Sequence, residues 1–249
     1  MYEVLFQYGP FTLRTLYVFS ALAFLATMIF LMRYASRKKL PASFLASHLA
    51  LFLITGLLGG RIVHILENLS HYGQNPLSAL FIWDLKLSAF GAFYAIIATL
   101  YALTRSVRET FWAWFDAFIL SGMVGLIFIH LGHFFNGTHY GKPTDMPWGM
   151  TFDTLNIPFL NPIHPTQLYS VLLTFLIFGF AMKYNRRTHL YGMVGSLTIM
   201  LYCLSAFAMD FLHGTPSTYD KISFLSIAGI ALILFISCSH QTYYQKNSH

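Results

Sequence analysis

Three histidines fall within ten positions of the stretch IHLGHFFNGTHYGKP, residues 129–143. His130 and His133 are three residues apart, so on a helix they would share one face and could meet one ligand. An imidazole titrates at about pH 6.5, so it can accept or donate a proton at neutral pH. We predict a polar substrate site here; a pair of satisfied interfacial histidines and a metal site are the alternatives. A metal would need further ligands, and three histidines could converge to supply them: His139, His164 and His213.

Ionisable side chains inside apolar segments are costly in a membrane and are therefore candidate functional residues. Asp210 and His213 are three residues apart at the end of another apolar segment. This carboxylate could orient a histidine, pair with Arg61, or be an ordinary helix-end charge. Arg61 follows Gly59 and Gly60, which would let another helix or a lipid headgroup approach closely. Arg61 could bind substrate or extend to the membrane interface.

Long apolar segments must position these side chains. The chain has 249 residues, of which 56% are hydrophobic and 10% charged, whereas roughly 25% of a soluble domain is charged. Apolar stretches of about 18 residues can cross the bilayer as helices. We therefore predict one all-α membrane domain, residues 1–249, with about seven transmembrane helices. The expected spans are residues 13–32, 44–66, 87–103, 111–134, 166–183, 190–212 and 222–240; the second and third could instead be re-entrant or buried helices.

Basic residues follow alternate segments, which predicts the orientation of the chain. An excess of Lys and Arg marks cytoplasmic loops, so the N-terminus is expected outside and the connection at about residues 136–165 is expected to be an extracytoplasmic loop. The first apolar segment is interpreted as a retained span. The net charge of +6 then reflects topology, and no nucleic-acid partner is expected. The clusters are Arg33, Arg37, Lys38, Lys39, Arg105, Arg108, Lys183, Arg186 and Arg187.

The segments LGHFFNGTHYGKPTDMPWGMTF and HPTQLY resemble the signature region of the prolipoprotein diacylglyceryl transferases, which are bacterial inner-membrane enzymes. The segments YGPFTLR, GGRIVHILENLSHYGQNPLSALFIWD and LSIAGI resemble other parts of that family, so the similarity extends in patches over nearly the whole chain. Matching positions include Gly60, Arg61, Asn75, Pro76, Trp83, Gly132, Phe134, Asn136, Gly137, Gly141, Pro143, Pro147, Trp148, Gly149, His164, Pro165, Gln167, Leu168 and Tyr169.

The resemblance implies a seven-span fold with its N-terminus outside. It also implies transfer of a diacylglyceryl group from phosphatidylglycerol to the lipobox cysteine of a prolipoprotein, with release of glycerol phosphate. The implied partners are the phospholipid and the signal peptide of the prolipoprotein, in the bacterial inner membrane, and no cofactor is implied. The candidate catalytic residues are His130, His133 and Asp210. The candidate substrate-binding residues are Arg61, Asn136, His164, Gln167 and Tyr169.

Several polar signature positions differ from the family pattern, although the glycines and prolines around them match. His130 stands where the pattern has Arg, His133 where it has Asn, and Thr138 where it has Glu. Two hypotheses follow. In the first, His130 or His133 accepts the thiol proton, while Arg61 and a protonated histidine hold the phosphate. In the second, a divergent paralogue binds or hydrolyses phospholipid, or binds lipoprotein, without the transfer. A transporter or channel is disfavoured because the polar residues cluster near one face. Further departures are Phe90 for His, Ser170 for Glu and Asp210 for Glu.

Overall fold

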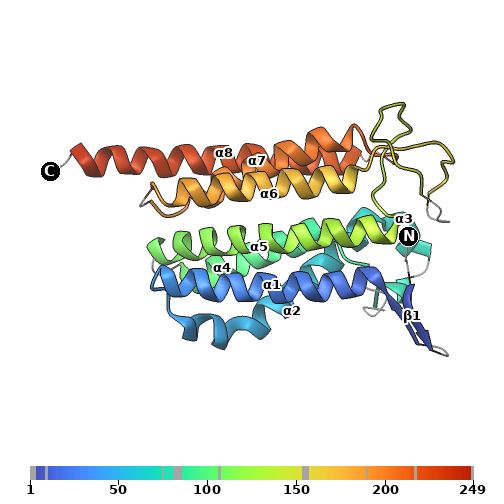
Figure 1. Ribbon diagram of the computed structural model, residues 1–249. Helices are drawn as coiled ribbons and strands as arrows, with labels where there is room; N and C mark the ends of the chain where they lie inside the picture. The colour runs from blue at the N-terminus through green and yellow to red at the C-terminus, as the bar shows by residue number, and fades with distance from the viewer. Residues whose placement is uncertain are drawn as a thin grey trace. The chain divides into compact units, whose positions relative to one another are not determined.

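In the computed structural model, the regular secondary structure of the described residues is helical apart from one short hairpin (Figure 1). Strand β1 (Val4–Tyr8) pairs antiparallel with β2 (Phe11–Arg14), which leads directly into the first helix. The all-α prediction did not include this hairpin. The structure describes residues 4–8, 11–74, 76–80, 86–105, 108–152, 157–188, 190–215 and 218–247. Asn75 and Trp83, two positions of the family resemblance, lie outside these ranges.

Among the residues that the structure describes, six helices are long and apolar enough to cross a membrane, so the predicted multi-pass helix bundle is confirmed at that level. The shorter α4 has 16 residues, which is about 24 Å of helix at 1.5 Å per residue. Its predicted role as a seventh span, and the orientation of the chain, therefore stay predictions. The helices are α1 (Thr15–Arg37), α2 (Ala42–Glu67), α3 (Leu69–Gln74), α4 (Ala89–Thr104), α5 (Arg108–Asn136), α6 (Thr166–Asn185), α7 (Met193–Asp210) and α8 (Thr218–Asn247), with the 3-10 helix η1 (Pro76–Leu80).

The chain divides into two compact units, Met1–Tyr34 with Asp116–His249 (unit 1) and Ala35–Phe115 (unit 2). In unit 2, α2 packs against α4 through glycines. A Cβ on Gly59 would lie 2.7 Å from the carbonyl oxygen of Gly91, which is too close for any other residue. The sequence predicted that another helix or a lipid headgroup would approach Gly59 and Gly60. In the structure, the helix α4 does so.

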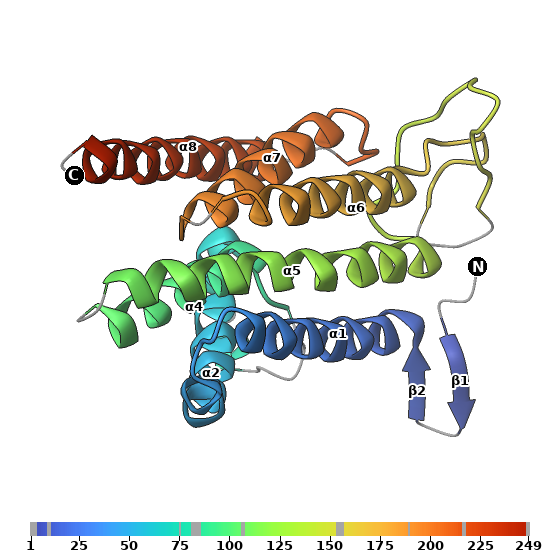
Figure 2. The same cartoon turned by 60° about the vertical axis from the view of Figure 1, so that its left-hand side comes forward.

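In unit 1, helices α1, α5, α6, α7 and α8 run roughly along one direction (Figure 2). Gly132 of α5 lies against Leu16 and Phe19 of α1, where a side chain would clash. At the opposite end of α5, the buried carboxylate of Asp116 accepts hydrogen bonds from the backbone N–H groups of Gly192 (2.8 Å) and Gly195 (2.6 Å) at the start of α7. Small residues and one buried carboxylate therefore fix α5 against its neighbours.

Between α5 and α6, the described residues form no helix and contact the end of α7 instead. Gly141 pairs with His213 as an isolated antiparallel bridge. The backbone N–H of Lys142 donates to the carbonyl of Leu212 (2.8 Å), and that of Gly214 donates to Tyr140 (2.9 Å). We call this end of unit 1, where residues 137–165 join α5 to α6, the loop end.

Candidate functional site

The turn after α5 folds His139 back over the end of that helix. Gly137 and His139 both have left-handed backbones, with φ of 70° and 55°. Such a conformation is uncommon for a residue with a side chain. The backbone N–H of Thr138 donates to the carbonyl of His133 (3.1 Å), and Nδ1 of His133 lies 2.8 Å from Oγ1 of Thr138. The rings of His133 and His139 consequently lie 4.2 Å apart, measured between their centroids.

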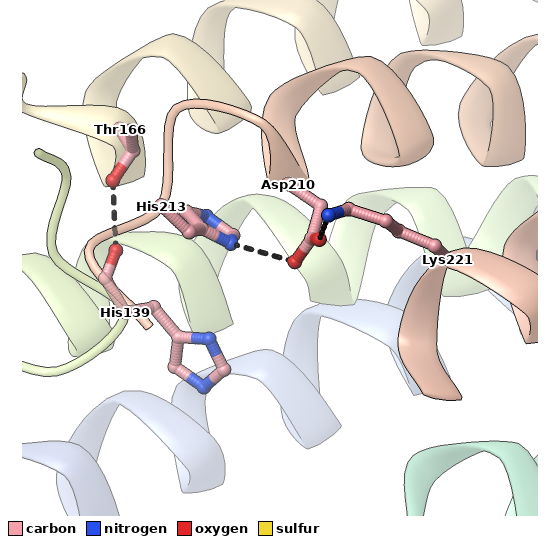
Figure 3. Close-up of polar contacts among 5 residues, drawn as sticks. All are labelled: His139, Thr166, Asp210, His213 and Lys221. Carbon is pink, nitrogen blue, oxygen red and sulfur yellow. Dashed lines mark hydrogen bonds and ion pairs between the residues drawn. The ribbon is translucent and has the colours of Figure 1, made fainter. Parts of the chain in front are cut away.

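The first two residues of α6 hold this turn in place. The hydroxyl of Thr166 donates to the carbonyl of His139 (2.8 Å, Figure 3), and the amide of Gln167 donates to the carbonyl of Thr138 (2.8 Å). Both side chains are buried. Within the described part of the chain, Oε1 of Gln167 has no hydrogen-bond partner. Gln167, a predicted substrate-binding residue, therefore fixes the turn and presents an acceptor atom that a ligand could use.

The end of α7 brings a carboxylate between an imidazole and an ammonium group (Figure 3). Asp210 is 3% exposed. Its Oδ1 lies 3.5 Å from Nδ1 of His213, and its Oδ2 lies 3.3 Å from Nζ of Lys221 on α8. The ring centroids of His213 and His139 are 6.1 Å apart. Of the roles predicted for Asp210, the structure contains the one in which it contacts a histidine.

Three imidazoles thus follow one another across the loop end, and we call His133, His139 and His213 the histidine cluster. They come from α5, from the turn after it and from the residues just after α7. The sequence offered His139, His164 and His213 as histidines that could converge here. The structure brings His139 beside His133 and His213 beside His139, whereas His164 contacts Tyr169. Among the described residues, no three His, Cys, Asp or Glu side chains are arranged as a metal site.

His130 lies one turn before His133 on α5 and has a different neighbour. Its Nε2 is 3.5 Å from the hydroxyl of Tyr202 on α7. Sequence reasoning placed His130 and His133 on one shared face, but it did not identify Tyr202. A tyrosine inside an apolar helix looks like an ordinary core residue, so the sequence contains no signal for this contact.

Burial and mutual repulsion disfavour charge on His139 and His213, the two members of the histidine cluster that lie outside the helices. Burial lowers the pKa of His139, and the nearby His213 lowers it further. Burial also lowers the pKa of His213, although Asp210 and Asp220 act in the opposite direction. Both imidazoles are therefore neutral at neutral pH, which is the form that accepts a proton.

Three further predicted site residues also belong to the loop end. Asn136 is the last residue of α5 and is buried. Nδ1 of His164 lies 3.3 Å from the hydroxyl of Tyr169 on α6. The backbone N–H of His164 donates to the carbonyl of Lys142 (3.0 Å), which ties this pair to the segment that contacts α7.

Arg61 belongs to unit 2, where it is buried and holds backbone groups. It donates to the carbonyls of Ser78 (Nη2, 2.8 Å), Ala79 (Nε, 3.1 Å) and Lys86 (Nη1, 3.1 Å). Its guanidinium carbon lies 5.5 Å from the centre of the Tyr72 ring. These contacts join η1 and the segment before α4 to α2, and a role in substrate binding stays a prediction.

Lys221 is a second residue of this region that the sequence did not indicate. It stands near the start of an apolar segment, where a lysine looks like an interfacial charge. Its Nζ also lies 4.6 Å from the centre of the Phe211 ring. Since Lys221 and Asp210 belong to different helices, no local spacing indicates that they meet.

A comparison with known families and proteins finds similarity to one family of transferases. The sequence model described as prolipoprotein diacylglyceryl transferase matches residues 3–240. A phosphatidylglycerol–prolipoprotein diacylglyceryl transferase from Chloroherpeton thalassium is 33% identical over 181 residues, covering 72% of this chain and 66% of that protein. One from Synechococcus sp. (strain CC9902) is 32% identical over 178 residues, covering 70% and 64%.

A third relative with the same name, from Clostridium tetani, is similar over a longer part of the chain. It is 28% identical over 226 residues, covering 87% of this chain and 88% of the relative. In the first two relatives the match spans slightly less than two thirds of their length.

Proposed function

The chain belongs to the prolipoprotein diacylglyceryl transferase family, and we propose that it transfers a diacylglyceryl group from phosphatidylglycerol to the lipobox cysteine of a prolipoprotein. The family match over residues 3–240 carries this proposal. The loop end supports it, because neutral imidazoles, a carboxylate and an ammonium group gather there in a chain of membrane helices.

The reaction needs a proton acceptor and a group that stabilises a departing phosphate. The cysteine thiol loses its proton to an imidazole, because the thiolate is the nucleophile. The sulfur then forms a C–S bond with the glycerol carbon that carries the phosphate. The C–O bond to the phosphate breaks, and its electron pair leaves with the phosphate oxygen. Glycerol phosphate departs and receives the proton that the thiol lost, so no proton is gained or lost overall.

The residues are proposed to divide these tasks. His130 or His133 accepts the proton of the thiol. Asp210 is the third proposed catalytic residue and supplies the carboxylate of the site. A protonated histidine stabilises the phosphate, whose charge needs fixed cations or donors in a water-poor place. Arg61 of unit 2 is proposed as a substrate-binding residue. Asn136, His164, Gln167 and Tyr169 are proposed to bind the polar part of phosphatidylglycerol. The unpartnered Oε1 of Gln167 would accept a hydrogen bond from a glycerol hydroxyl.

We further propose that the whole chain acts as one domain in a bacterial cytoplasmic membrane. In this arrangement α4 is the seventh span, the N-terminus is outside, and the loop end faces the extracytoplasmic side, where a prolipoprotein signal peptide presents its cysteine. The alternation of basic clusters along the sequence supports this orientation.

The proposal is tested by incubating the purified chain, in nanodiscs of phosphatidylglycerol, with a lipobox peptide. The matched control peptide carries Ser in place of Cys. Mass spectrometry should detect a thioether-linked diacylglyceryl group on the Cys peptide alone, and one glycerol phosphate per modified peptide. Glycerol phosphate released equally with both peptides would indicate a phospholipid hydrolase. Bound lipid without either product would indicate a binding paralogue. Either result would reject the proposed transfer.

A further inference from the structure

We propose that His213 is the imidazole that becomes protonated during the transfer and stabilises the departing phosphate, and that Lys221 is a positioning residue for its carboxylate partner, Asp210. This inference rests on the proposed function and deepens it. It names one member of the histidine cluster, and it gives a role to a lysine for which neither the sequence motifs nor the family comparison provides one.

His213 differs from the other members of the cluster because it has a carboxylate beside it. Oδ1 of Asp210 lies 3.5 Å from Nδ1 of His213, while Nδ1 of His133 faces the hydroxyl of Thr138 instead. A carboxylate favours the protonated form of a nearby imidazole. A proton released into the cluster is therefore most stable on His213. Asp210 contacts Nδ1, so Nε2 is left for a substrate oxygen.

The backbone fixes the place of His213 as well. Its N–H donates to the carbonyl of Asp210 (3.3 Å), and the residue forms the isolated bridge with Gly141. A side chain on Gly141 would clash with His164, so this segment is held closely. These backbone contacts therefore fix the position of His213 at the loop end.

Lys221 contacts the second oxygen of the Asp210 carboxylate. Its Nζ lies 3.3 Å from Oδ2 of Asp210, and its ammonium group lies 4.6 Å from the centre of the Phe211 ring. A buried carboxylate is strongly disfavoured unless a cation or hydrogen-bond donors compensate its charge. With Oδ2 held by Lys221, Oδ1 is directed to His213 (Figure 3). The positive charge of Lys221 also moderates the attraction between Asp210 and the His213 proton.

The groups that face His213 determine which way its titration moves. Asp210 on α7 and Asp220 on α8 favour its protonated form. Lys221 and the neighbouring imidazoles His130 and His139 oppose it when they are charged. Removing Lys221 should therefore raise the pKa of His213, and removing the charge of Asp210 should lower it. If Lys221 only stabilised the fold, its removal would not raise the pKa of His213.

During the reaction the proton would pass in one direction. The thiol gives its proton to the histidine cluster, and the proton comes to rest on Nε2 of His213. As the C–O bond breaks, the new negative charge on the phosphate oxygen attracts this imidazolium. The proton then leaves with glycerol phosphate, and His213 returns to its neutral form.

The first arm of the test measures the titration of His213 directly. Full-length protein with 13C-labelled histidine, in phosphatidylglycerol nanodiscs, is titrated by NMR, and His213→Gln identifies the resonance. The pKa of His213 should rise in Lys221→Met, fall in Asp210→Asn and stay unchanged in Lys221→Arg. Lys142→Met is the matched control, since Lys142 is an exposed lysine of the same loop end, and it should leave the titration unchanged. No shift in Lys221→Met would overturn the positioning role.

The second arm measures transfer to the lipobox peptide across pH. His213→Gln should lower kcat by roughly 10²-fold or more, the usual range for an acid–base group. In Lys221→Met the acidic limb of the pH profile should move to higher pH, and Lys221→Arg should restore it. Full turnover in His213→Gln would overturn the role of His213. Wild-type protein that forms no thioether would reject the proposed function itself, whatever the NMR titration shows about Lys221.

Discussion

A buried aspartate lies at each end of helix α7, Asp116 of α5 at its start and its own Asp210 at its end, and the two make different contacts. At its start, Asp116 accepts hydrogen bonds from the backbone N–H groups of Gly192 (2.8 Å) and Gly195 (2.6 Å). At its end, Asp210 contacts two titratable side chains, His213 (3.5 Å) and Lys221 (3.3 Å). One carboxylate is held by the backbone, and the other by groups whose charge can change.

We propose that this difference separates a structural carboxylate from a functional one. Backbone donors at the first turn of a helix do not titrate, and they favour a negative charge through the helix dipole. Asp116 therefore suits a permanent connection between α5 and α7. The charge around Asp210 depends on the proton of His213, so this end of α7 can respond to a reaction. Burial alone does not distinguish the two, because Asp116 and Asp210 are 2% and 3% exposed.

The largest effect on stability is expected at the Asp116 end. Asp116→Ala removes the acceptor of two buried N–H groups, which should lower the free energy of unfolding by roughly 3–5 kcal/mol. Thermal unfolding in nanodiscs measures the change, and Asp145→Ala, at an exposed carboxylate of the loop end, is the control. Turnover per folded molecule should stay near that of wild type. A stable but inactive Asp116→Ala protein would remove the distinction between the two aspartates.

A smaller loss is expected where α6 holds the turn of His139. Thr166→Val keeps the shape of the side chain and removes its hydrogen bond to the carbonyl of His139. The free energy of unfolding should fall by about 1–2 kcal/mol, and turnover should fall because the imidazole is displaced. Thr144→Val in the same loop segment is the control. Unchanged stability together with unchanged turnover would show that this hydrogen bond does not position His139.

The smallest effect should appear in the pH dependence of stability. The pKa of His139 is lowered in the folded state by burial and by His213, so the unfolded chain binds the proton more readily. Stability is then complete above about pH 6.5, the pKa of an exposed histidine, and is lost as the pH falls below it, by at most about 1.4 kcal/mol per pH unit. His139→Gln should flatten this dependence between pH 7 and pH 5. An equal slope in both proteins would contradict the assignment.

The helices of this fold were largely predictable from the sequence, because apolar length determines where a membrane helix can form. The predicted segment 111–134 lies within α5, and the segment 166–183 lies within α6. The exposed hairpin β1–β2 was not predicted, since its few residues contain no long apolar pattern.

The candidate site was predictable only in part. The spacing of His130 and His133 indicated a shared helix face, yet the turn at Gly137 and His139 gives His133 a new neighbour. Left-handed backbone at His139 leaves no signature in the sequence. Lys221 was missed for a similar reason, because its contact with Asp210 depends on how two separate helices pack.

The most direct test compares both aspartates by their transfer rates. Thioether formation on a lipobox peptide is measured per folded molecule, at pH 7, for wild type, Asp116→Asn and Asp210→Asn. We predict a thioether product at near wild-type rate in Asp116→Asn and a rate reduced by roughly 10²-fold in Asp210→Asn. Equal rates in the two variants, or no thioether in the wild-type reaction, would contradict the proposal that this protein is a diacylglyceryl transferase whose reaction depends on Asp210 at the loop end.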